Sequence, residues 1–156
     1  MEGPPGRPVV VVLERMSVEP NPSAQYRLTI AQGFLAEARQ NLADTQWRAC
    51  VEHCQLSVEN AAKAALALIG PVPRTHDPAT TLHRALGQNR FPEAARAGVE
   101  RLAALAGQLG ADVHIAISYG DEDALQSPWD LIEERDALEA MEFADDACRL
   151  AEQLMR

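Results

Sequence analysis

The longest helical pattern in the chain runs from Thr45 to Ile69. Thr45 is predicted to cap its start, and Gly70 followed by Pro71 ends it. At about 100° per residue, a broad apolar face and a narrow charged stripe lie on opposite sides of this helix. The apolar face consists of Trp47, Val51, Cys54, Val58, Ala62 and Ala65, and the charged stripe of Arg48, Glu52, Gln55, Glu59 and Lys63. We therefore expect a central helix whose apolar face is buried.

Apolar residues recur at helical spacing in four further segments. The five predicted helices span residues 23–43, 45–69, 78–86, 91–109 and 133–155. The connection at Asp44 and Thr45 is so short that the first two helices must be antiparallel neighbours. Turn-rich strings between residues 111 and 132 predict an irregular crossover before the last helix. The expected fold is all-α, an up-and-down antiparallel bundle of four long helices plus one short helix.

Two further helices have start signals in the sequence. Ser23 is the expected N-cap of the first helix, and Thr75 and Asp77 are both good caps for the short one. The predicted apolar side of the first helix consists of Tyr26, Ile30, Phe34 or Leu35, Ala38 and Leu42.

The chain has 156 residues, of which 47% are hydrophobic and only 4% aromatic. This length fits one domain with a buried core, and the abundance of alanine and leucine favours close-packed helices over a sheet. Residues 1–22 are rich in proline and glycine and are predicted to form a flexible N-terminal extension, in which 9–13 is a short β-branched run. The helical bundle is expected to span residues 23–156.

The formal net charge of the chain is −9. A constitutive nucleic-acid partner is not expected, since phosphate binding needs clustered lysine and arginine, although a short or local RNA contact stays open. The sequence has no leader pattern and no apolar run of about 18 residues, so neither secretion nor a membrane span is expected. We therefore expect a cytoplasmic protein.

The three cysteines, Cys50, Cys54 and Cys148, all fall within predicted helices. They are interpreted as reduced core residues. A zinc site would need two further ligands at ligand spacing, and His53 points to a different side of the helix from Cys50 and Cys54. Acidic residues 121–123 lie in a predicted turn and are expected to be solvated. We expect no metal and no cofactor.

The charged stripe contains two oppositely charged pairs, Arg48 with Glu52 and Glu59 with Lys63. Members of each pair stand four residues apart, which is typical of a solvated helix face. The alternative is that another helix, a partner chain or a ligand partly covers the stripe.

His76 precedes Asp77 in the loop after the long helix. This pair fits a general base with its orienting carboxylate, or a cap that starts the short helix and holds the loop. The sequence contains no glycine-rich phosphate loop, zinc-protease helix motif or serine elbow. Catalysis of those classes is therefore not expected.

Five features follow one another along the chain. They are Trp47, the string Glu59-Asn60-Ala61-Ala62-Lys63, the loop at His76-Asp77, the turn Tyr119-Gly120-Asp121 and the string Ala144-Asp145-Asp146-Ala147. Together they resemble a HEPN domain (higher eukaryotes and prokaryotes nucleotide-binding) over about residues 23–155. The resemblance implies an antiparallel helical bundle, usually dimeric and often encoded with a small nucleotidyltransferase. It also implies either nucleotide binding or metal-independent RNA cleavage.

Members of this family that cleave RNA carry an arginine, about four to six residues and a histidine just after the long helix that precedes the crossover. Aligning on Tyr119 places Asp112 and Ile117 at about those two positions. The one Arg-x4–6-His string in the chain is Arg48 to His53, inside the long helix, where the two side chains point about 140° apart. They cannot hold one phosphate together within a monomer, although a site shared across a dimer stays open.

The leading hypothesis is a non-catalytic, HEPN-like interaction module that forms a homodimer and binds a partner protein, with a nucleotidyltransferase as the candidate, or a nucleotide-like ligand. The homodimer is expected from apolar residues on more than one side of the long helix and from a crossover that exposes Trp129 and Ile132. The candidate ligand contacts are Glu59, Lys63, Arg74 and His76. The alternatives are a toxin-like endoribonuclease, with Arg48 and His53 as its candidate catalytic residues, and a purely structural helical subunit.

Overall fold

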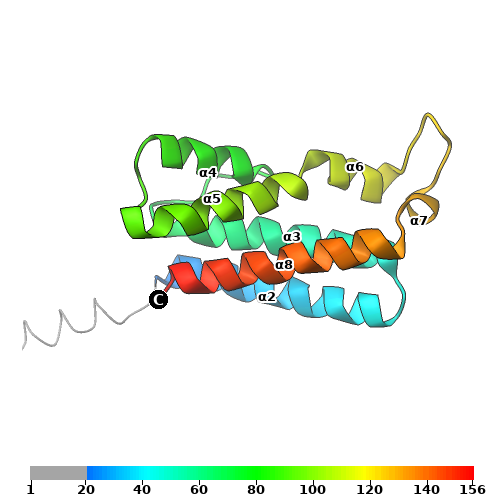
Figure 1. Cartoon of the computed structure of the whole chain (residues 1–156), viewed down its shortest axis with the longest axis horizontal. Coiled ribbons are helices and arrows are strands. Elements are labelled where there is room, and N and C mark those ends of the chain that lie inside the picture. Colours follow the sequence, from blue (N-terminus) through cyan, green and yellow to red (C-terminus); the bar gives the residue numbers. More distant parts are fainter. Residues whose placement is uncertain (1–20) are drawn as a thin grey trace, which may run out of the picture.

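The computed structural model describes residues 21–156, and the regular elements in this part of the chain are α-helices (Figure 1). They are α2 Pro22–Ala43, α3 Trp47–Ala67, α4 Pro78–Gly87, α5 Glu93–Gln108, α6 Ala111–Tyr119, α7 Pro128–Leu131 and α8 Glu134–Leu154. The four longest, α2, α3, α5 and α8, lie along the long axis of the molecule, with α4 beside α5 near one end and α6 and α7 at the other. The predicted all-α fold is confirmed. Residues 1–20 of the predicted N-terminal extension, which include the run at 9–13, lie outside the described residues.

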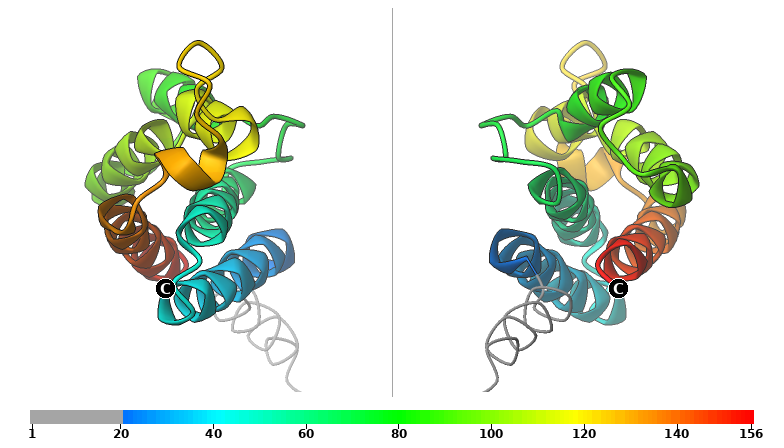
Figure 2. Two further views of the ribbon diagram at one scale, coloured as in Figure 1. Left: turned by 90° about the vertical axis from the view of Figure 1, so that its right-hand side faces the viewer. Right: turned by 90° about the vertical axis from the view of Figure 1, so that its left-hand side faces the viewer.

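α3 is the central helix of the bundle. It packs against α2, α4, α5, α6 and α8, and the end-on views show α2, α5 and α8 arranged around it (Figure 2). Thirteen of its 21 residues are buried, including Val51, Val58 and Ala62, and Trp47 is partly buried in its first turn. The predicted apolar face is therefore confirmed. Most apolar residues on the other sides of α3 are also buried within the same chain, so they give no support for a second copy.

The turn into α3 differs from the prediction. Thr45 does not cap this helix, because α3 begins at Trp47 and Gln46 precedes it. Thr45 has a left-handed backbone conformation with φ of 57°, since the chain reverses within three residues. The backbone N–H of Gln46 donates to the carbonyl of Asn41 at 2.8 Å and closes the turn. The helix ends at Ala67, two residues before its predicted end.

α2 begins at Pro22, and its cap is Asn21 rather than the predicted Ser23. The side-chain oxygen of Asn21 accepts a hydrogen bond from the N–H of Ala24 at 3.0 Å. Its amide nitrogen donates to the carbonyl of Ala67, also at 3.0 Å. One side chain therefore caps α2 and ties its start to the end of α3.

The buried side of α2 also differs from the predicted stripe. Its buried residues are Ala24, Leu28, Ala31, Leu35 and Ala38. Tyr26, predicted on the apolar side, is exposed. The small side chains let α2 approach α3 so closely that the hydroxyl of Ser57 donates to the carbonyl of Ala31 at 2.7 Å. Close packing of alanines, rather than burial of the largest side chains, determines which side of α2 faces the core.

A helix, α6, forms where the sequence predicted an irregular crossover. Its apolar side chains follow no single helical stripe, and Ile117 is the one residue of α6 that is buried. Gly120 follows with φ of 70°, where a Cβ would lie 2.1 Å from the carbonyl oxygen of Gln126, so this position requires glycine. Asp121 and Gln126 then exchange two backbone hydrogen bonds, at 2.9 and 3.0 Å. The crossover is thus a helix and a closed hairpin that lead into α7.

α8 begins as predicted. The side chains of Glu133 and Asp136 form a capping box, in which each accepts a hydrogen bond from the other residue's backbone N–H. Its buried residues are Ala137, Ala140, Met141, Ala144, Ala147, Cys148 and Ala151. This side packs against α2, α3 and α5 and completes the core.

Candidate functional site

Two charged residues of α3 and a histidine of the following loop meet on one side of the bundle. Nζ of Lys63 lies 3.3 Å from Oε2 of Glu59, and Oε1 of the same carboxylate lies 3.4 Å from Nδ1 of His76. Lys63 is only 8% exposed, whereas the side chain of His76 is 97% exposed. The charged stripe is therefore partly covered by the chain itself, which agrees with the second of the two interpretations of this stripe.

A hollow of about 200 Å³, here called the polar hollow, opens beside Glu59 and His76. Its walls come from α3, the loop before α4 and the junction between α5 and α6. Gln55 of α3 holds this junction, because its amide nitrogen donates to the carbonyls of Leu109 at 3.2 Å and Gly110 at 3.0 Å. Polar side chains from two separate segments thus converge on one hollow.

The sequence neighbours of His76 have other surroundings. The carboxylate of Asp77 caps α4 by accepting hydrogen bonds from the backbone N–H of Thr80 at 3.3 Å and from its hydroxyl at 2.7 Å. Asp77 therefore holds the loop, whereas His76 contacts Glu59. Arg74 is exposed and forms no hydrogen bond or ion pair with another residue in the range 21–156. The structure leaves Arg74 outside the group formed by the other three candidate contacts.

Arg48 reaches toward α6 and α7. Its guanidinium donates to the carbonyl of Ile117 at 2.8 Å and to the carboxylate of Glu52 at 2.7 Å. The same group lies over the ring of Trp129, 5.3 Å from the ring centroid. Arg48 is therefore held by contacts within the chain.

His53 contacts α2 instead. Its Nδ1 lies 2.6 Å from Oδ1 of Asn41 and its Nε2 lies 3.2 Å from the carboxylate of Glu37. The ring stacks on Phe34 with centroids 6.0 Å apart. Because Arg48 is bound at α6 and α7 and His53 at α2, the two side chains do not converge within the chain.

Comparison with known families identifies this bundle. The sequence profile of the HEPN domain matches residues 24–154. The chain belongs to the HEPN domain family. A search of the curated proteins found no match. Among residues 21–156, no helix combines the length and the apolar character that a membrane crossing needs.

Two positions in α6 of this HEPN domain bear on RNA cleavage. Asp112, at the place expected for the arginine, is exposed in the first turn of the helix, and Ile117, at the place expected for the histidine, is buried. Asp112 has the wrong charge to bind a phosphate, and Ile117 has no group that exchanges a proton. α6 therefore carries neither of the two residues at its expected position.

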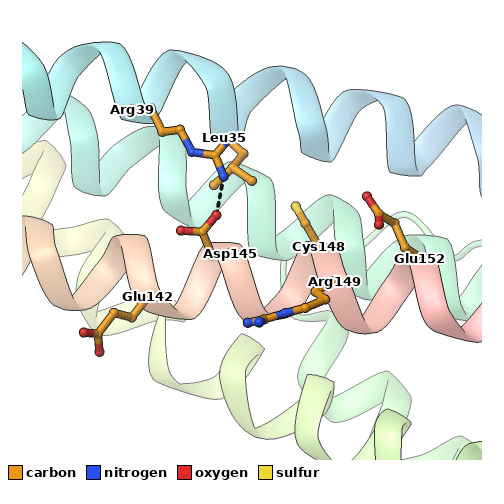
Figure 3. A pocket seen from close by; sticks show the side chains of 7 residues that line it. All are labelled: Leu35, Arg39, Glu142, Asp145, Cys148, Arg149 and Glu152. Carbon is orange, nitrogen blue, oxygen red and sulfur yellow. Dashed lines mark hydrogen bonds and ion pairs between the residues drawn. The ribbon is translucent and has the colours of Figure 1, made fainter.

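A larger hollow, of about 540 Å³, lies between α2 and α8 of the HEPN domain (Figure 3). Arg39 of α2 forms an ion pair across it with Asp145 of α8. Arg149, which also lines it, pairs with Asp146 at 3.2 Å, and Cys148 contributes to the lining although it is buried. The hollow is a groove between two helices in which several charges are already paired.

The cysteines are free and lie in the core, as predicted. A hydrogen bond with Cys50 and burial raise the pKa of Cys54, whose sulfur lies 3.5 Å from that of Met141. Burial raises the pKa of Cys148, which lies 3.3 Å from the hydroxyl of Ser57. Across residues 21–156, no three or more His, Cys, Asp or Glu side chains are grouped so as to hold a metal ion.

One further hollow, of about 410 Å³, is not apparent from the sequence. Trp47, Arg48 and Trp129 line it together with Ile132, and we call it the tryptophan hollow. Trp129 is 72% exposed, as predicted, but Ile132 is buried, which corrects the expectation that the crossover exposes both. Ile132 lies between α7 and α8. It is buried because α7 packs against α3 and α6. Only the folded chain brings these residues together, since they come from α3 and α7.

Proposed function

We propose that this HEPN domain is a non-catalytic interaction module that forms a homodimer and binds a nucleotide-like ligand or a partner protein, with a small nucleotidyltransferase as the candidate partner. The observation that carries the proposal is the convergence of Gln55, Glu59 and His76 on the polar hollow. A small hollow with a few convergent polar groups is typical of a site that binds a small ligand.

The chemistry of the polar hollow selects the kind of ligand group that fits. The carboxylate of Glu59 accepts hydrogen bonds, and Lys63 offsets its charge from behind. The group that Glu59 favours is therefore a donor, such as the amino edge of a base or a ribose hydroxyl, rather than a phosphate. A volume of about 200 Å³ is below the range of about 300–1,000 Å³ that encloses a whole small ligand. The hollow thus suits one part of a nucleotide, with the remainder outside.

The separation of Arg48 from His53 supports a non-catalytic role. Cleavage of RNA needs a base near the 2′-hydroxyl and a cation near the phosphate at the same time. Each of the two side chains has its own partners on a different helix, so moving them together would break contacts at both places.

Nucleotide binding is tested by thermal denaturation and titration calorimetry with AMP, ATP and adenosine. A ligand that binds the folded state raises the melting temperature with the logarithm of its concentration relative to Kd, by several degrees at a concentration of about 100 times Kd. We expect His76→Ala to weaken binding at least tenfold and Glu59→Gln to do the same. His83→Ala, which changes an exposed histidine on α4, is the matched control and should bind as the wild type does. If none of the three compounds binds, or if the His83 variant loses binding equally, the ligand part of the proposal fails.

The partner part is tested separately. Where the genome encodes a nucleotidyltransferase beside this chain, the two proteins are co-expressed, and only one of them carries an affinity tag. Co-elution in a fixed ratio through a subsequent sizing column is the expected result. Elution of the two proteins as separate peaks at micromolar concentration would contradict this assignment.

A further inference from the structure

Exposed large apolar side chains gather at one end of the molecule. Among residues 21–156, all of them except Tyr26 fall between Ile115 and Leu138. This segment contains most of α6, the hairpin, α7 and the start of α8, and the hairpin projects away from the bundle at the end that carries α6 and α7 (Figure 1). Such a concentration on one surface is typical of an interaction site.

Part of this surface is a hollow of about 570 Å³ between α6, the hairpin and α7. Ile115 and Tyr119 of α6, which are 52% and 62% exposed, line it together with the partly buried Leu131. A single helix turn separates Ile115 from Tyr119, so both side chains lie on the same side of α6. We call it the acidic hollow, because carboxylates lie beside these apolar groups.

Four carboxylates line the same hollow. They belong to Asp112, Asp121, Glu122 and Asp123. None of them forms an ion pair with a residue in the range 21–156. The wider segment 111–136 contains eight acidic residues and one arginine, so it holds most of the net charge of the chain. An apolar surface with an uncompensated negative rim is complementary to an apolar surface with a positive rim.

The backbone holds this surface in place. The two hydrogen bonds between Asp121 and Gln126 close the hairpin, and the carboxylate of Asp121 accepts a further one from the N–H of Ala124 at 3.1 Å. Gly120 fits against the carbonyl of Gln126, where no other residue has room. A partner that binds here does not have to order the loop first, which lowers the conformational-entropy cost of binding.

We propose that the acidic hollow is a docking surface for a basic, amphipathic helical segment of a partner protein. Apolar side chains of the segment pack on Ile115 and Tyr119, while its lysine or arginine side chains pair with the carboxylates. A second copy of this chain would oppose four carboxylates with four more, and an RNA or an anionic membrane would meet the same repulsion. The inference rests on the proposed role as an interaction module and adds the chemistry of the partner.

The probe is a fluorescein-labelled synthetic helix of leucine and lysine, and a leucine–glutamate helix of the same pattern is its control. Fluorescence anisotropy should show saturable binding of the lysine helix to the wild type, weakened by raising the salt concentration. Ile115→Ser/Tyr119→Ser should weaken binding at least tenfold, and Glu122→Gln/Asp123→Asn by a similar factor. The matched controls are Tyr26→Ser, which removes an exposed aromatic ring on α2, and Glu100→Gln/Glu142→Gln, which removes two charges from other helices. Both controls should bind as the wild type does.

Several outcomes overturn the proposal. They are absence of saturable binding by the wild type, equal binding of the glutamate helix, and equal losses in the control variants. Conversion of a dimer to a monomer by Ile115→Ser/Tyr119→Ser would show that a second copy occupies the surface instead. His76→Ala should leave binding of the lysine helix unchanged. Nucleotide binding at the polar hollow and helix binding at the acidic hollow are therefore tested with different variants, and either proposal can fail without the other.

Discussion

Lys63 is buried although it is charged, and its ammonium group lies 3.3 Å from the carboxylate of Glu59 one turn earlier on α3. Lys63 is the only lysine in the chain. A buried charge is tolerated when it is paired, and the removal of one partner leaves the other uncompensated. The two side chains are 10% and 17% exposed, so solvent screens part of the effect.

We therefore expect Glu59→Gln to lower the free energy of unfolding by about 2 kcal/mol. Lys63→Met should lower the free energy of unfolding by a smaller amount, because the long apolar side chain fills the space and Glu59 keeps His76 as a neighbour. The double variant should be more stable than Glu59→Gln alone, since no charge is left unpaired. Urea denaturation measures all three, with Glu100→Gln, from an exposed pair with Arg96, as the control. Equal stability of Glu59→Gln and the wild type would show that the pair contributes nothing.

Val58 is 1% exposed and lies on the core side of α3. An aspartate there would have no partner, and the expected loss of about 4 kcal/mol or more is enough to unfold many domains of this size. Circular dichroism of Val58→Asp should show an unfolded or severely destabilised protein. Leu138→Asp, at an exposed position of α8, should keep a melting temperature close to that of the wild type. A normal melting temperature for Val58→Asp would mean that the faces of α3 are assigned incorrectly.

The helices with continuous periodicity are the ones that the sequence predicts well. α3 and α8 have an apolar stripe along their full length. α6 was missed because a single buried residue, Ile117, anchors it and its remaining apolar residues face several directions. The core side of α2 was predicted incorrectly because alanines, which carry a weak hydrophobic signal, fill the closest contacts.

The candidate site also contains one contact that the sequence predicts and others that it does not. Glu59 and Lys63 are related by helix geometry, so their pairing follows from the sequence alone. The contact between Glu59 and His76 depends on the path of the loop after α3, which no local pattern specifies. The hydrogen bonds from Gln55 to the α5–α6 junction depend on a long-range packing arrangement and have no sequence signal.

Self-association is expected at the tryptophan hollow. Trp129 is exposed there, and no carboxylate lines this hollow, so two copies can meet without the repulsion of the acidic hollow. Light scattering at micromolar concentration should give about twice the chain mass of 17.0 kDa. Trp129→Ser should shift the protein toward the monomer, whereas Tyr26→Ser should not. A wild type of monomeric mass at this concentration would contradict the homodimer.

The cysteines should resist modification in the folded protein. Because the pKa values of Cys54 and Cys148 are raised, less thiolate is present near pH 8 than in an unfolded chain, and burial blocks access as well. We expect slow reaction with a thiol-specific disulfide reagent in native buffer and rapid reaction of all three thiols in urea. For Cys54 and Cys148 the sign for stability follows: their thiols ionise at lower pH in the unfolded chain, so these two groups should reduce the free energy of unfolding as the pH rises above about 8.5. A hydrogen bond with Cys54 lowers the pKa of Cys50, so the contribution of Cys50 has the opposite sign. Rapid labelling of a thiol under native conditions would show that the core opens locally.

The protein should not cleave RNA at a rate that depends on Arg48 or His53. Arg48 is held by the carbonyl of Ile117 and the carboxylate of Glu52, and His53 lies against Asn41 on another helix, so they cannot act on one phosphodiester within a chain. Single-stranded RNA is incubated without metal with the wild type, Arg48→Ala and His53→Ala, and the products are separated on a denaturing gel. Any trace of cleavage should be equal in the three proteins, as expected for a contaminating nuclease. Cleavage by the wild type that both substitutions abolish, with melting temperature and mass unchanged, would establish a site shared across the dimer and overturn the non-catalytic assignment.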